Sequence, residues 1–244
     1  MNVIPVSSSS KGNAYIVEQD GQALLIDCGV CCRTLRNAYD LSRVSAVLIT
    51  HSHTDHISGL PVLLKHYDIP VYANAMTAES VAALEHLDDS HFTCFENGQD
   101  FEVGAFTIAP FSIPHDTSDP VGYLIRAAGT TYFHGTDIGT PLDSIGLKLA
   151  EADIATLESN HDPVMLKTSG RHPSIIQRIA GPRGHLSNAQ ACDLVRRFAS
   201  PRLKKLMLAH LSQDCNTPRF AEETMRETLA EIHRDDIVLE ILSP

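Results

Sequence analysis

The chain has 244 residues, of which 43% are hydrophobic and 20% charged, the composition of an ordinary globular protein. Its formal net charge of −11 argues against a protein held to nucleic acid or to anionic membranes by its charge as a whole, although a local basic patch stays compatible with it. No apolar run approaches the roughly 18 residues of a membrane span, and the start has no charged segment followed by an apolar one. We therefore expect a cytoplasmic protein with no membrane partner.

The cysteines do not indicate a disulfide framework. There are six, irregularly spaced along the chain, and thiols stay reduced in the cytosol. Cys28 and Cys31 have the spacing of a redox or zinc pair, but no second pair of this kind follows. We give this pair little weight.

Short β-type runs alternate with stretches of helical spacing. Ser7 to Ser10 is read as a turn between the first two strands. One compact α/β domain over residues 1–244 is the simplest interpretation, and a sandwich of two similar halves also fits. The predicted elements, in chain order, are strands 14–17 and 23–27, helix 31–39, strand 44–50, helix 60–67, strand 71–73, helix 77–87, strands 106–113, 121–126 and 131–134, helix 142–150, strand 154–158, helix 188–199, strand 205–209, helix 219–233 and strand 237–241.

The strongest chemical signal follows the strand at 44–50. Four side chains that can bind metals, His51, His53, Asp55 and His56, occupy six positions there. Residues two apart point in opposite directions on a helix, so the spacing predicts a loop on which all four converge. Imidazole and carboxylate groups suit zinc, manganese or iron, and four ligands so close together fit two adjacent metals better than one.

Three later segments offer further ligands, each a polar residue at the end of an apolar run. They are His115, Asp137 and His210. Taken singly, each could equally be a cap or a surface group. Small residues around Asp137 allow close backbone approach. Beside the first cluster, the three become candidates for the remaining metal ligands.

The order of these residues resembles the metallo-β-lactamase superfamily. The resemblance implies an α/β fold, a four-layer αβ/βα sandwich of two mixed sheets flanked by helices, and a site for two metals. It implies that one metal is bound by His51, His53 and His115, the other by Asp55, His56 and His210, with Asp137 bridging both. No ligand position is a cysteine, which disfavours the lactamase activity that names the superfamily.

Further blocks resemble the YycJ branch of the superfamily, also called WalJ or VicX. This branch is described as cleaving phosphodiesters, with DNA exonuclease activity from the 5′ end. The chain departs from the branch pattern between Thr168 and Pro173 and at Cys215, which affects details of substrate contact. The blocks lie at residues 9–15, 26–29, 115–123, 157–162, 183–188 and 210–218.

A basic stretch surrounds one of these blocks. Between residues 160 and 205, nine Lys and Arg residues stand against two Asp residues. In an acidic protein this fits a phosphate-lined groove beside the site, or a run of solvated helix faces. His185 lies just before Ser187, a good N-cap for the helix at 188–199, where a phosphate would be attracted. His185 is therefore a candidate to contact the scissile phosphate or protonate the leaving oxygen, and His161 is a second candidate that could instead orient another histidine.

The hypothesis from the sequence is a dinuclear-metal phosphodiesterase that acts on nucleic acid, DNA rather than RNA. Two divalent ions would bridge the hydroxide that attacks phosphorus, and Asp55 would orient it and accept its proton. Two other classes stay open. One is a small-molecule thioester or lactone hydrolase, which would not need the basic stretch, and the other is a non-catalytic metal-bound regulator.

Overall fold

The structure is a computed structural model that describes residues 1–242. It contains two compact units: the first comprises residues 1–112, 117–121 and 125–129, and the second residues 113–116, 122–124 and 130 onward. No helix within residues 1–242 is long and apolar enough to cross a membrane.

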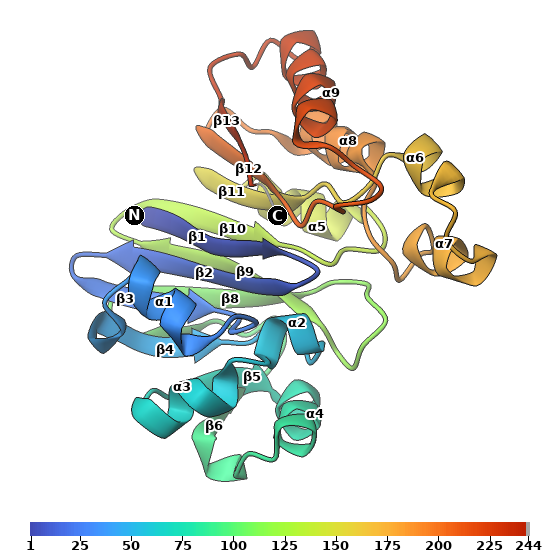
Figure 1. The fold of residues 1–244 in the computed structure, drawn as a ribbon. Coiled ribbons are helices and arrows are strands. Elements are labelled where there is room, and N and C mark those ends of the chain that lie inside the picture. Colours follow the sequence, from blue (N-terminus) through green and yellow to red (C-terminus); the bar gives the residue numbers. More distant parts are fainter. Residues whose placement is uncertain (243–244) are drawn as a thin grey trace. The chain divides into compact units, whose positions relative to one another are not determined.

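A six-stranded mixed sheet forms the centre of the first unit (Figure 1). The two pairs that join the first three strands are antiparallel and the other three pairs are parallel. Strands buried on both faces are apolar along their length, and Ile16, Leu25 and Val47 of the central strands are fully buried. In order across the sheet the strands are β1 (Asn2–Ser9), β2 (Gly12–Gln19), β3 (Gln22–Ile26), β4 (Val44–Leu48), β5 (Val71–Asn74) and β6 (Phe92–Phe95).

Four helices belong to the same unit, and two single 3-10 turns lie at Leu41–Arg43 and Asp89–His91. The helices are α1 (Cys32–Ala38), α2 (Thr54–Ile57), α3 (Leu60–His66) and α4 (Ala75–Glu85). Helix α1 contacts β1, α2 contacts β2, and α4 contacts β5 and β6. Leu35, Leu60 and Val81 of these helices join one apolar core with the sheet. This packing holds α2 in place directly after β4.

The second sheet has seven strands. In order across it they are β13 (Val238–Ile241), β12 (Lys205–Ala209), β11 (Ile154–Glu158), β10 (Thr130–Gly135), β9 (Val121–Ala127), β8 (Phe106–Ser112) and β7 (Phe101–Val103). Neighbours from β10 to β13 are parallel, whereas β7 and β8 are antiparallel. Because parallel strands end at the same edge of a sheet, Asp137, Glu158 and His210 emerge together there.

Five helices follow in the second unit: α5 (Asp143–Leu149), α6 (Pro163–Thr168), α7 (Pro173–Ile179), α8 (Asn188–Phe198) and α9 (Pro218–Glu231). Helix α8 packs against α5 and α9, and α9 packs on β13. Ser187 is the N-cap of helix α8, as the sequence predicts. The Ser187 hydroxyl accepts from the Gln190 backbone N–H, and the Gln190 side chain accepts from the Ser187 N–H, which makes a capping box.

Loss of this cap is expected to be measurable. We expect Ser187→Ala to lower the free energy of unfolding by about 1 kcal/mol, because the Gln190 backbone N–H loses its acceptor and the Gln190 side chain loses the hydroxyl that donates to it. Urea unfolding followed by circular dichroism checks this. Ser80→Ala is the control, since Ser80 lies inside α4 and bonds only to the Met76 carbonyl. Equal midpoints for both variants would show that the cap contributes nothing.

The predicted fold class, two mixed sheets flanked by helices, is confirmed. Each strand and helix that the sequence predicts is present within a few residues of its expected ends. The turn expected at Ser7 to Ser10 is wrong, because Ser7, Ser8 and Ser9 pair in β1 and the turn lies at Ser10 and Lys11. Strand β1 escaped prediction because it is an edge strand with a proline and a register shift at Pro5, so its pattern does not alternate.

Candidate metal centre

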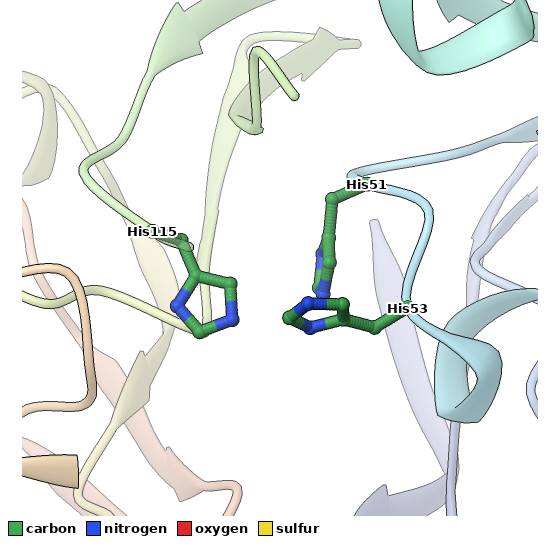
Figure 2. Close-up of side chains that lie close together, drawn as sticks. All are labelled: His51, His53 and His115. Carbon is green, nitrogen blue, oxygen red and sulfur yellow. The ribbon is translucent and has the colours of Figure 1, made fainter. Parts of the chain in front are cut away.

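Two histidines project from the loop that follows β4 (Figure 2). His51 is fully buried and His53 is partly exposed, and the centroids of their rings lie 4.8 Å apart. Asp55 and His56 lie on α2, which corrects the expectation that all four residues share a loop. The His56 ring is 4.0 Å from the His51 ring, and its Nε2 is 3.6 Å from Asp55 Oδ2. The four residues of the motif are therefore gathered within the first unit.

A buried carboxylate fixes the orientation of His56. Asp27, the residue after β3, accepts hydrogen bonds from His56 Nδ1 at 2.7 Å and from the Thr50 backbone N–H at 2.8 Å. Burial raises the pKa of Asp27 above its usual range, and the His56 ring and Thr50 act against that shift. Because Nδ1 is engaged, Nε2 is the ring atom left to bind a metal, and it faces Asn13 Nδ2 at 3.1 Å.

We expect Asp27→Asn to weaken metal binding by about 10- to 100-fold, since an amide lacks the charge that holds the His56 ring and cannot accept from all the same donors. Competition with a fluorescent chelator measures this affinity. Asp68→Asn, at an exposed position, removes the same charge and is the control. Identical metal affinities for the two variants would contradict the role of Asp27.

The segment that follows Asp27 needs glycine to pack against α2. A Cβ on Gly29 would lie 1.7 Å from the Asp55 carbonyl oxygen. The backbone N–H of Cys28 also donates to the His56 carbonyl at 2.7 Å. Cys28 is buried, Cys31 is exposed, and both thiols are free. This segment therefore positions α2 and its two candidate ligands by close backbone contact.

In the second unit, the side chains after β8, β10 and β12 converge. His115, labelled in Figure 2, follows β8 and is buried. Its Nε2 lies 3.7 Å from Asp137 Oδ1, and its Nδ1 faces the Gly184 carbonyl at 3.0 Å. His210 Nδ1 lies 3.4 Å from the same Asp137 oxygen. The structure thus brings together the three later candidates that the sequence predicts.

Glu158, at the end of β11, ties this group to His185. Its Oε1 accepts from His185 Nδ1 at 2.8 Å and from His210 Nδ1 at 3.0 Å. Its Oε2 accepts from the backbone N–H groups of Ile138 and Leu186, each at 2.9 Å. Burial raises its pKa, but the His185 charge and the two histidine hydrogen bonds outweigh burial, so the pKa lies at about 2. Glu158 is therefore a carboxylate that orients two rings and two loops.

Glu158 and Asp27 are not among the site residues that the sequence predicts. Each follows or ends an apolar strand, which is the same signal that identified Asp137. What the sequence lacked was their partners, because the histidines that they orient lie 27 or more positions away along the chain.

The two histidines proposed as catalytic differ in their surroundings. The side chain of His185 is partly exposed, and its ring lies 5.1 Å from that of His115. His161 is buried, and desolvation lowers its pKa. Its backbone bridges to Ser187, and its Nδ1 has no hydrogen-bond partner among residues 1–242. His185 is thus placed among the candidate ligands, whereas His161 is buried and its backbone pairs with Ser187, two residues after His185.

Three of these strand ends have a strained backbone. Asp27, Asp137 and His210 all have φ between 56° and 59°, in the left-handed region, which is uncommon for residues other than glycine. Such strain is found where a side chain is held for function. Asp27 contacts the candidate ligand His56, and Asp137 and His210 are candidate ligands themselves. The strain therefore supports a functional role for the candidate ligands of both units.

The donor set fits divalent metals. It consists of imidazole nitrogens and carboxylate oxygens, the groups that bind zinc, manganese and iron. Within the second unit, one atom each of Asp137, Glu158, His185 and His210 lies within 4.8 Å of the others. Buried carboxylates orient His56 and His210 through their Nδ1 atoms, as is usual around bound metals. The assignment of each residue to a metal stays a prediction.

Comparisons with known proteins agree with the resemblance. Residues 22–211 match the family model described as the beta-lactamase superfamily domain. The chain is 31% identical over 234 residues to exodeoxyribonuclease WalJ of Streptococcus pneumoniae, which covers 93% of this chain and 87% of that protein. It is 33% identical over 237 residues to exodeoxyribonuclease YycJ of Bacillus anthracis, with 93% and 88% covered.

A solved structure shows the same fold. The metallo-β-lactamase fold protein YhfI of Bacillus subtilis aligns with a TM-score of 0.73 at 17% identity, over 98% of this chain and 95% of that one. The prediction of a metal-dependent hydrolase of this superfamily is confirmed. The chain belongs to the β-lactamase superfamily, and along nearly its whole length it is similar to the exodeoxyribonucleases WalJ and YycJ.

Proposed function

We propose that the chain is a two-metal exodeoxyribonuclease that acts from the 5′ end of DNA. The observation that carries this proposal is the similarity over 93% of the chain to proteins named exodeoxyribonucleases. The histidine and carboxylate groups at the strand ends support it, because such groups bind the divalent ions that assist phosphodiester hydrolysis. A cytoplasmic location and a single functional domain over residues 1–244 belong to the same proposal.

The proposed metal ligands are the seven residues that the sequence predicts. One metal is assigned to His51, His53 and His115, the other to Asp55, His56 and His210, with Asp137 shared. Zinc, manganese and iron all suit these ligands. When bound, the ions supply Lewis acidity and lower the pKa of a water toward neutrality.

The chain's own residues would move the protons. Asp55 orients the attacking water and accepts its proton. His185 donates a proton to the leaving oxygen, because Glu158 engages its Nδ1 and leaves Nε2 for the substrate. The N-terminus of α8, whose N-cap Ser187 lies two residues later, favours a negative phosphate nearby. His161 is the weaker candidate for substrate contact, because it is buried.

The test is cleavage of matched 5′-phosphorylated duplex DNA, single-stranded DNA and RNA by metal-free protein reconstituted with manganese or zinc. We expect stepwise release from the 5′ end of DNA, lost in a His53→Ala control. Cleavage of RNA but not of DNA would show that the substrate is RNA. Hydrolysis of a thioester or lactone without any nucleic acid cleavage would favour the small-molecule hydrolase, and metal binding without turnover, bis(p-nitrophenyl) phosphate included, would favour the regulator.

A further inference from the structure

A segment of the second unit has an unusual charge. Residues 163–184, here called the basic arm, contain Lys167, Arg171, Arg178 and Arg183 and no Asp or Glu, in a chain whose net charge is −11. The basic arm leaves the end of β11 shortly after Glu158 and leads directly into His185. Any ligand bound along it is therefore continuous with the proposed site of proton donation.

The basic arm is exposed to a degree that packing does not explain. Helix α7 has no buried residue, and α6 buries only Leu166. In Figure 1 the two helices lie at the right edge of the view, away from α9. A helix that is stabilised by packing against the rest of its protein normally buries one face. Helices α6 and α7 therefore present free surface that a ligand can cover.

The rest of the basic stretch is neutralised by neighbouring carboxylates. Arg196 pairs with Glu231, Arg197 with Asp143 and Asp193, and Arg202 with Asp153. Lys204 and Lys205 pair with Asp236 and Glu240. Helices α8 and α9 together carry four Arg residues and five acidic residues. Of the residues 160–205 for which the sequence predicts a positive groove, the basic arm is therefore the part that keeps a net positive charge.

Three of the four cations of the basic arm can bind a phosphate, whereas Arg183 donates to the His115 carbonyl. Lys167 has no ion-pair partner among residues 1–242. Arg171 pairs with Asp214, whose side chain is 70% exposed, and Arg178, itself 66% exposed, pairs with Asp116. Exposed ion pairs contribute little to stability, because water screens both charges. A phosphodiester can therefore replace either carboxylate at little cost.

The apolar residues of the basic arm share faces with its cations. Val164 is 68% exposed and lies three positions before Lys167 on α6. Ile175 is 43% exposed and lies three positions before Arg178 on α7. Residues three apart are neighbours on a helix surface. The cations can bind phosphates, and the aliphatic side chains beside them can contact bases, which a single strand exposes and a duplex hides.

We infer that the basic arm binds a single strand of the nucleic acid substrate and guides it to His185. This inference rests on the proposed function and adds a surface that selects polymers over small phosphodiesters.

The test compares two variants that each remove two positive charges. Lys167→Ala/Arg171→Ala changes the basic arm. Arg196→Ala/Arg226→Ala changes α8 and α9, where each arginine has a carboxylate partner. Binding of a fluorescent single-stranded 20-nucleotide DNA to each protein in EDTA is followed by anisotropy over a range of salt. The metal-loaded proteins are then assayed for kcat and KM on the same DNA and on bis(p-nitrophenyl) phosphate.

We expect the arm variant to raise both Kd and KM for the DNA about tenfold and to reduce the salt dependence of binding, with kcat on bis(p-nitrophenyl) phosphate unchanged. The α8–α9 variant should match the wild type. If both variants weaken DNA binding equally, or neither does, the inference about the basic arm is overturned. The proposed function still stands in that case, provided that the wild type cleaves DNA. Tighter binding of duplex than of single strand, with the same arm dependence, would overturn the assignment to a single strand. Absence of any wild-type DNA cleavage would overturn the proposed function itself.

Discussion

Glu158→Gln is expected to lower kcat/KM for phosphodiester hydrolysis about 100-fold and to weaken metal binding by about 10- to 100-fold. Both carboxylate oxygens accept two donors each, from His185 and His210 on one side and from Ile138 and Leu186 on the other. A glutamine has one accepting oxygen, so its amide N–H₂ must face two donors. Either the two rings or the two loops lose their anchor.

Separate readouts distinguish orientation from folding. Chelator competition measures metal affinity. Turnover is measured on bis(p-nitrophenyl) phosphate, and urea unfolding gives the free energy of unfolding. Glu231→Gln, an exposed position paired with Arg196, is the control. If turnover falls by far more than the unfolded fraction of the variant can explain, the result supports Glu158 as a positioning residue. Turnover and metal affinity equal to those of the control would show that neither ring depends on it.

The sequence predicted the candidate ligands because their signal is local. The His51 to His56 motif lies within six positions, and Asp137 and His210 each follow an apolar strand. The residues that hold these ligands are not local: Asp27 reaches His56 across 29 positions and Glu158 reaches His210 across 52. Only the parallel strand order brings such pairs together.

The missed elements have a related cause. Strand β6 has four residues, none of them buried, and α7 likewise buries none, so neither shows an apolar period. Helix α2 is a single turn of four residues that follows two histidines of the motif, and a run of polar ligands favours a loop on propensity alone. Packing against β2 and Gly29 overrides that preference.

Asp55→Asn is expected to lower kcat by about 100- to 10,000-fold, the range for loss of a positioned general base. The asparagine keeps the size of the side chain on α2 but loses the charge and the ability to accept a proton. Asp55 Oδ2 accepts from Asn13 Nδ2 at 3.2 Å, so its orientation is set before substrate binds. Turnover of bis(p-nitrophenyl) phosphate is the measurement, with Asp68→Asn as the matched change of charge at an exposed position.

Metal content separates the two roles given to Asp55. If the asparagine variant binds both metals, measured by elemental analysis after gel filtration, and turns over slowly, then Asp55 acts on the proton as well as on the metal. If one metal is lost and added metal restores turnover, then ligation is its main role. Near-normal turnover with both metals bound would falsify the assignment. The proton would then have to leave through another group, and among the described residues His185, which is partly exposed beside Asp137, is the group to change next.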